Sequence, residues 1–154
     1  MEGFIELINE ITKFGLNPNI NLSDKERDLE RHLIKLYQFY FDIEFEQEYL
    51  DYPDFNISTL PNIRENIGLN FPDFGFYHSA LNMTEDDKEP EWGLGDAVDD
   101  LLDITTDLLK IKWRIENNSL VDGLWFFDFT FTNHLKEHIL GLLSYMKQKE
   151  LKNS

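Results

Sequence analysis

The chain has 154 residues, of which 42% are hydrophobic, and this length and composition predict one domain, residues 1–154, with a hydrophobic core. Thirty acidic residues against 14 basic ones give a formal net charge of −16 with His neutral. This charge argues against nucleic acid and anionic membranes as partners, because both are bound through Lys and Arg. The sequence has no Cys, which excludes disulfides and thiolate metal sites. Because no basic leader or apolar run of membrane-spanning length is present, we expect a cytoplasmic protein.

Two helices are predicted at the start of the chain. Apolar side chains recur at helical spacing over residues 3–14 and predict the first helix. Ser23 and Glu26 have the spacing of a capping box, in which each side chain satisfies a free backbone N–H of the first helical turn. They predict a second helix that continues to about residue 46 or 48.

A short helix and a long loop are expected next. Thr59 is the expected N-cap of a short helix over residues 59–68. Residues 69–93 combine turn-forming residues with many aromatic ones, which is typical of an irregular loop packed against the protein. Residues 84–107 hold ten acidic side chains and one basic one, so this short stretch carries more than half of the net charge.

The helix expected over residues 97–115 has the strongest periodic signal. Its apolar side chains cover a wide arc of the helical wheel, so we expect it to pack against neighbours on two sides. Its polar strip contains Asp99, Asp100 and Asp103, a spacing that can share a hard cation. The alternative is a solvated acidic helix start, which is favoured by the helix dipole and is the commoner explanation.

A last helix is expected from Ser119, which forms a capping-box pattern with Asp122, to about Lys149. Residues 125–132 also suit a strand, because aromatic and β-branched residues dominate them. We favour a helix that is continuous through residues 127–143, because the apolar positions share one helical face. The predicted fold class is therefore all-α, a single-domain helical bundle of four main helices plus a short helix and an aromatic, acidic loop.

The second half of the chain carries a family resemblance. Residues 95–108 read GDAVDDLLDITTDL, and Trp125 is followed by the pair His134 and His138. Over roughly residues 94–146 these features resemble an uncharacterised bacterial all-helical family named domain of unknown function 5063. The resemblance implies a compact helical bacterial protein. It implies no reaction, because the family has none assigned to it.

The two histidines His134 and His138 are the candidate metal ligands. They lie four residues apart, a spacing that places two imidazoles on one helical face. Asp100 and Asp107 border the apolar arc of the preceding helix and are expected to reach them. The favoured interpretation is a structural pair, in which the histidines hydrogen-bond to aspartate and tie two helices together. The alternative is a site for a divalent metal, formed by both histidines with Asp100 or Asp107.

Two functions of different class follow from these patterns. The favoured hypothesis is a non-enzymatic protein, a protein-interaction or immunity-like module, that binds a basic partner through its acidic surface. The alternative is a metal-dependent hydrolase-like bundle that uses the two histidines. The sequence indicates no catalytic nucleophile and no organic cofactor. The candidate partner-binding residues are Glu85, Asp86, Asp87, Glu89, Glu91 and Trp92.

Overall fold

The fold was analysed in a computed structural model that describes residues 2–47, 50–56, 60 and 62–153. The chain is mostly helical and carries one small antiparallel sheet of two strands within the described residues. In chain order the elements are α1 (Glu2–Leu16), α2 (Lys25–Asp42), α3 (Ile63–Asn70), β1 (Phe76–Ala80), β2 (Trp92–Asp96), α4 (Ala97–Asn117), α5 (Leu120–Thr130), the π-helical segment η2 (Phe131–Leu135) and α6 (Lys136–Asn153).

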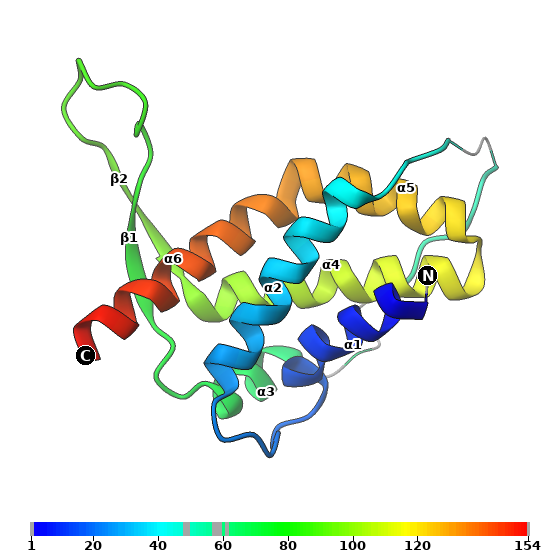
Figure 1. The fold of residues 1–154 in the computed structure, drawn as a ribbon, viewed down its shortest axis with the longest axis horizontal. Coiled ribbons are helices and arrows are strands. Elements are labelled where there is room, and N and C mark those ends of the chain that lie inside the picture. Colours follow the sequence, from blue (N-terminus) through cyan, green and yellow to red (C-terminus); the bar gives the residue numbers. More distant parts are fainter. Residues whose placement is uncertain (1, 48–49, 57–59, 61, 154) are drawn as a thin grey trace.

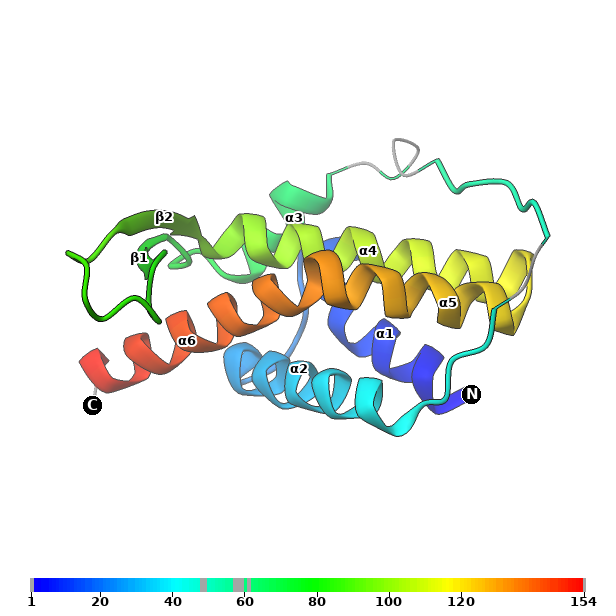
Figure 2. The same ribbon diagram turned by 90° about the horizontal axis from the view of Figure 1, so that it is seen from above.

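Helix α4 lies at the centre of the fold, as its wide apolar arc predicts. It packs against α1 and α3 on one side and against α5 and α6 on the other, and α2 covers α6 (Figures 1 and 2). The side chains of Leu101, Ile104 and Leu108 are completely buried, and they join residues of all the helices in one hydrophobic core. This packing places the polar strip of α4 opposite the last helical segment of the chain.

The predicted helix ends differ from the observed ones by a few residues. Asp24, rather than Ser23, caps α2, because its carboxylate accepts a hydrogen bond from the backbone N–H of Arg27. Helix α2 also ends earlier than expected, at Asp42. Helix α3 begins at Ile63 and continues two residues beyond Gly68; Thr59, its expected cap, lies outside the described residues.

The region expected to be an irregular loop contains a β-hairpin, which corrects that part of the all-α prediction. Strands β1 and β2 pair antiparallel, with Tyr77 opposite Gly95 and Ala80 opposite Trp92. Gly95 is required here, because a Cβ at this position would overlap the Tyr77 ring. The hairpin projects from one end of the helices (Figure 1), and its connecting loop carries the acidic residues. The alternation of apolar and polar side chains that marks a strand is obscured in β2, because two of its five residues are glycine.

The last helical region contains no strand, which agrees with the helical prediction for residues 127–143. Ser119 caps α5 by accepting a hydrogen bond from the backbone N–H of Asp122, as expected. However, the helix is not a uniform α-helix, since residues Phe131–Leu135 form a π-helical turn between α5 and α6. Such turns insert an extra residue into a helix and change the side-chain phase after it.

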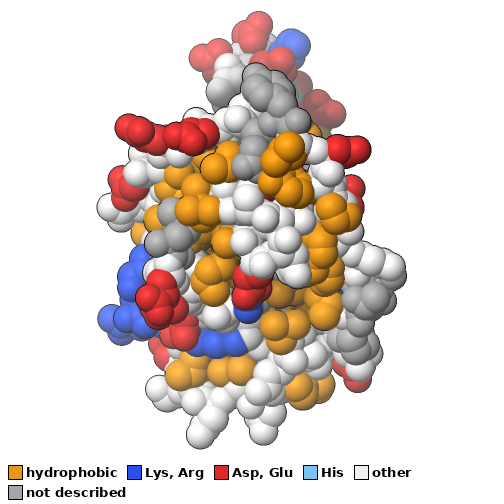
Figure 3. All heavy atoms as spheres, turned by 90° about the vertical axis from the view of Figure 1, so that its right-hand side faces the viewer, with side chains coloured by type: hydrophobic (Ala, Val, Ile, Leu, Met, Phe, Trp, Pro, Cys, Tyr) orange, Lys and Arg blue, Asp and Glu red, His pale blue; other side chains and the backbone are white. Residues whose placement is uncertain are grey.

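The end of the molecule opposite the hairpin has several exposed hydrophobic side chains. Phe41, Trp125 and Phe129 are all exposed, and the rings of Trp125 and Phe129 stack with their centroids 5.8 Å apart. Figure 3 views this end and shows hydrophobic side chains interspersed with polar ones. In the described part of the chain, no helix combines the length and apolar character needed to cross a membrane.

Candidate functional site

Two pairs of side chains join α4 to the last helical segment. On α4, Asp100 and Asp107 lie two turns apart on one face. The Nδ1 atom of His138 lies 2.8 Å from an oxygen of Asp100, and the Nδ1 atom of His134 lies 2.5 Å from an oxygen of Asp107. The structure therefore brings together all four residues that the sequence singled out for a metal site.

The remaining nitrogens of the two imidazoles face each other. The Nε2 atoms of His134 and His138 are 3.1 Å apart. An oxygen of Asp103, one turn along α4 from Asp100, lies 3.3 Å from Nε2 of His138. One potential ligand atom from each of these three residues lies within 4.8 Å of the other two. We call Asp103, His134 and His138 the His/Asp cluster.

The hydrogen bonds determine which ring nitrogens carry protons. A carboxylate only accepts hydrogen bonds, so Nδ1–H of His134 donates to Asp107 and Nδ1–H of His138 donates to Asp100. In neutral imidazoles with this tautomer, both Nε2 atoms present lone pairs. Two lone pairs at 3.1 Å, with the Asp103 carboxylate beside them, repel one another. A cation between these atoms removes the repulsion, and it is either a proton on one ring or a metal ion.

The local charges make the cluster attractive to cations. The hydrogen bond to Asp100 raises the pKa of His138 above its ordinary value; burial opposes this rise, and Asp103 adds to it. Burial raises the pKa of Asp107, whereas its hydrogen bond with His134 works in the opposite direction. Asp100 and Asp107 are buried in the wall of the bundle, which holds both rings in place from behind.

A third carboxylate contact links the hairpin to the cluster. The hydroxyl of Tyr77 in β1 donates a hydrogen bond of 2.5 Å to the second oxygen of Asp100. Gly141 of α6 leaves room for this hydroxyl, because a Cβ there would lie 2.6 Å from it. Burial, followed by the hydrogen bond to Asp100, raises the pKa of Tyr77. Asp100 is therefore held on one side by Tyr77 and on the other by His138.

The cluster opens to solvent on the side of the hairpin. The side chains of His134 and Asp103 are 44% and 39% exposed. Asp103 and His138 also line a groove of about 940 Å³ between the hairpin, the start of α4 and α6. The groove therefore reaches Asp103 and His138, and the side chain of His134 is partly exposed.

The three aspartates of α4 occupy different positions around the two histidines, and Asp103 was not among the carboxylates that the sequence grouped with them. Asp100 and Asp107 contact the Nδ1 atoms and so lie behind the rings, whereas Asp103 faces the Nε2 atoms. The signal for Asp103 was present in the aspartate spacing of the α4 strip, which the sequence linked only to a separate cation site. The π-helical turn had no recognisable signal. Within this turn Leu135 is completely buried, whereas the side chain of His134 is 44% exposed.

A second group of potential ligands was not anticipated from the sequence. Glu10 of α1 and Asp28 and His32 of α2 also place one ligand atom each within 4.8 Å of the others. The sequence did not predict this group, because its residues come from two helices that meet only in the folded protein. Lys13 lies among them, with its Nζ 2.6 Å from Glu10 and 2.9 Å from Asp28. Both carboxylates are therefore already paired with an ammonium group, and a guanidinium nitrogen of Arg31 lies 3.7 Å from Asp28.

The candidate partner-binding residues lie on the hairpin. Glu85, Asp86, Asp87 and Glu89 are exposed in its connecting loop, and Lys88 is 3.4 Å from Glu85. The other two candidates are Glu91, which is exposed just before β2, and Trp92, the first residue of β2, which is 62% exposed.

No protein-family model, curated protein or solved structure matches the chain. Membership of residues 94–146 in the family named domain of unknown function 5063 therefore stays a prediction. Function is inferred from the side-chain geometry alone.

Proposed function

We propose that the protein binds a divalent transition metal at the His/Asp cluster and acts as a metal-dependent hydrolase. The observation that carries this proposal is the pair of Nε2 atoms 3.1 Å apart, each on a ring whose Nδ1 is bound to a carboxylate. Two imidazoles on one tetrahedral metal have their ligating nitrogens about 3–3.5 Å apart, because each metal–nitrogen distance is about 2.1 Å. The observed spacing agrees with this geometry.

The positions of the outer carboxylates also support a metal site. Metal-binding histidines commonly donate their second ring N–H to a carboxylate, which fixes the tautomer and makes the ligating nitrogen more basic. Both histidines have such a partner here, Asp107 for His134 and Asp100 for His138.

The ligand set favours zinc and leaves a coordination position free. Two imidazoles and one carboxylate are typical protein ligands of catalytic zinc, whose fourth position holds water or substrate. A zinc ion in such a site lowers the pKa of its bound water towards neutrality. In ester hydrolysis the oxygen of water bonds to the acyl carbon, the ester C–O bond breaks, and the alcohol leaves with a proton. The groove beside Asp103 and His138 provides space for a substrate.

Metal binding is tested with apoprotein prepared by chelation and without a metal-affinity tag. We expect one equivalent of Zn²⁺ to bind, and we expect Co²⁺ to give the absorption bands of a four-coordinate site with nitrogen and oxygen ligands. At a free zinc concentration of 100 times the Kd, binding stabilises the folded protein by about 2.7 kcal/mol. His138→Ala abolishes these effects, and His32→Ala, in the second group of ligands, retains them. Failure of the wild-type protein to bind either ion overturns the metal site.

Hydrolysis is tested separately with p-nitrophenyl acetate as the probe. Zinc-loaded protein is expected to release p-nitrophenol faster than apoprotein, with a rate that rises as pH increases. Loss of this difference in His134→Ala supports the assignment. Stoichiometric zinc binding without any difference in rate overturns the hydrolase role and leaves a structural metal.

A further inference from the structure

The groove beside the His/Asp cluster is lined by both exposed apolar side chains and carboxylates. It is bounded by the hairpin on one side and by α4 and α6 on the other. Figures 1 and 2 show the hairpin crossing this end of the helices before it extends beyond them. The groove is long enough to be lined by both strands, by the start of the hairpin loop and by two turns of α6.

Exposed apolar side chains form one part of its lining. Leu81 and Met83 of the hairpin loop are 62% and 79% exposed, and Leu140 of α6 is 47% exposed. Surface hydrophobic residues that occur singly need no explanation, but several around one concave surface indicate a binding site.

The other part of the lining is acidic. Asp103 and Glu137 line the groove and form no ion pair with Lys or Arg in the described part of the chain. Two further carboxylates, Asp96 and Asp99, are paired with Arg64, which lies outside the groove. No Lys or Arg is among the described residues that line it.

We propose that this groove binds an extended segment of a basic protein that combines Lys or Arg with apolar side chains. The cationic groups pair with Asp103 and Glu137, and the apolar groups contact Leu81, Met83 and Leu140. Charge complementarity identifies this occupant: a second copy of a chain with a net charge of −16, or a nucleic acid, meets like charge in the groove. The proposal concerns the metal-free protein, because Asp103 is also a ligand of the proposed metal site.

The acidic hairpin loop extends the negative electrostatic potential beyond the groove. Its carboxylates are exposed and outnumber the single Lys88. Exposed charges of this kind mainly accelerate the encounter with an oppositely charged partner, whereas the contacts in the groove determine how slowly the complex dissociates.

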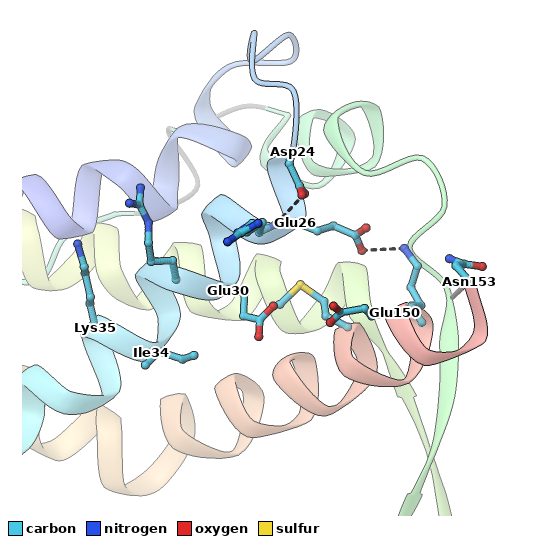
Figure 4. Close-up of a pocket in the computed structure, with 11 residues that line it drawn as sticks. Asp24, Glu26, Glu30, Ile34, Lys35, Glu150 and Asn153 are labelled. Atoms are coloured by element: carbon cyan, nitrogen blue, oxygen red, sulfur yellow. Dashed lines mark hydrogen bonds and ion pairs between the residues drawn. The ribbon is translucent and has the colours of Figure 1, made fainter.

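A second groove, between α2 and the end of α6, provides an internal control. It is lined by side chains of both signs, among them Glu26, Glu30 and Lys35 (Figure 4). An oxygen of Glu26 lies 2.7 Å from Nζ of Lys149. Glu30 and the exposed Ile34 line this groove much as Glu137 and Leu140 line the hairpin groove. Because its charges are mixed and partly paired, it offers no comparable site for a cationic segment.

The experiment measures binding of fluorescently labelled ten-residue peptides to apoprotein in the presence of a chelator and physiological salt. The probes are an alternating Lys-Leu peptide, a Lys-Ser peptide and a Glu-Leu peptide. We expect the Lys-Leu peptide to bind at least tenfold more tightly than either of the others. The double substitution Glu137→Gln with Leu140→Ser is expected to weaken it at least tenfold, and the matched Glu30→Gln with Ile34→Ser leaves it unchanged.

Three results overturn the proposal. Equal affinity for the Lys-Leu and Lys-Ser peptides indicates non-specific attraction to a negative protein. Equal weakening by both double substitutions places the peptide elsewhere. Absence of binding by a wild-type protein that still binds zinc removes the peptide site and leaves the metal proposal intact, so the two failures are distinguishable.

Discussion

The described residues include two groups of potential histidine and carboxylate ligands, and these groups differ in how their charge is balanced. In the second group, the ammonium of Lys13 lies between Glu10 and Asp28. Burial works to lower the pKa of Lys13, but its hydrogen bonds to the two carboxylates outweigh this and raise it. The His/Asp cluster has no Lys or Arg in ion-pair contact among the described residues.

The difference shows that proximity of ligand atoms does not by itself make a metal site. In both groups the three potential ligand atoms lie within 4.8 Å of one another. In the second group, His32 donates through Nδ1 to the backbone carbonyl of Asp28, and its Nε2 lies 3.9 Å from Glu10. Among the described residues no second imidazole lies there, and the ammonium of Lys13 is already in place. In the His/Asp cluster two Nε2 atoms and one carboxylate converge, and no Lys or Arg of the described part of the chain forms an ion pair with them.

The largest expected effect is the loss of zinc affinity when a histidine of the His/Asp cluster, rather than the histidine of the second group, is replaced by alanine. His134→Ala or His138→Ala removes a ligand from the His/Asp cluster and is expected to lower zinc affinity by about a hundredfold or more, above the usual cost of a change behind the ligands. His32→Ala is expected to leave zinc affinity unchanged. Competition with a chromophoric chelator measures all three. Equal losses of zinc affinity in the His138→Ala and His32→Ala variants would contradict the assignment of the metal to the His/Asp cluster.

A smaller loss is expected when the carboxylates behind the rings are changed. Asp100→Asn and Asp107→Asn keep the size of the side chain but weaken the acceptor for Nδ1–H, and we expect zinc affinity to fall about 10–100-fold. Tyr77→Phe removes only the outer hydrogen bond to Asp100 and is expected to cost less. Unchanged affinity in Asp107→Asn would mean that packing alone orients His134.

Removal of the balancing cation tests the second group directly. Lys13→Met leaves Asp28, which is mostly buried, and Glu10 without their ammonium partner, and we expect a loss of stability of about 1–3 kcal/mol. The same variant is expected to bind a second equivalent of zinc weakly. Urea unfolding measures the loss of stability, and zinc titration measures the stoichiometry. The control is Lys35→Met, which removes an exposed lysine of α2. A stoichiometry that stays at one would show that charge balance is not what excludes a metal there.

The smallest expected effect is a change of stability with pH in the apoprotein. The pKa of His138 is raised in the folded protein, mainly by its hydrogen bond to Asp100. Its protonation therefore stabilises the fold fully below the unfolded value of about 6.5, and this contribution is lost as pH rises through the higher folded value. We expect the Tm of chelated protein to fall over this range and His138→Gln to flatten the curve. With zinc the trend reverses, because the ligating imidazole must be deprotonated. A Tm of the chelated wild-type protein that rises over this range would contradict the assignment of a protonated His138.

Much of the helical architecture could be predicted, but the ends of the elements could not. The central position of α4 follows from its wide apolar arc, and the capping role of Ser119 follows from its spacing to Asp122. The choice between Ser23 and Asp24 as the cap of α2 depends on backbone angles that neighbouring capping residues do not reveal. The hairpin was missed because Gly93 and Gly95 interrupt the alternation of apolar and polar residues in β2. The need for glycine arises only in the folded hairpin, where Leu81 packs over Gly93 and Tyr77 over Gly95.

The sequence by itself determined which chemistry is available. It has no Cys, an excess of carboxylates, a periodic row of aspartates on one helix and two histidines spaced for one helical face. These are properties of composition and of the helical repeat, so they can be read from local order alone.

Only the tertiary structure decided how these groups divide their roles. His134 lies in the π-helical turn and His138 just after it, and the packing of α4 against this region sets Asp103 in front of the rings and Asp100 and Asp107 behind them. The three aspartates follow the same helical pattern, and only the facing helix distinguishes them. A ligand position is defined by the direction of a lone pair in space, and contacts between residues far apart in the chain set that direction.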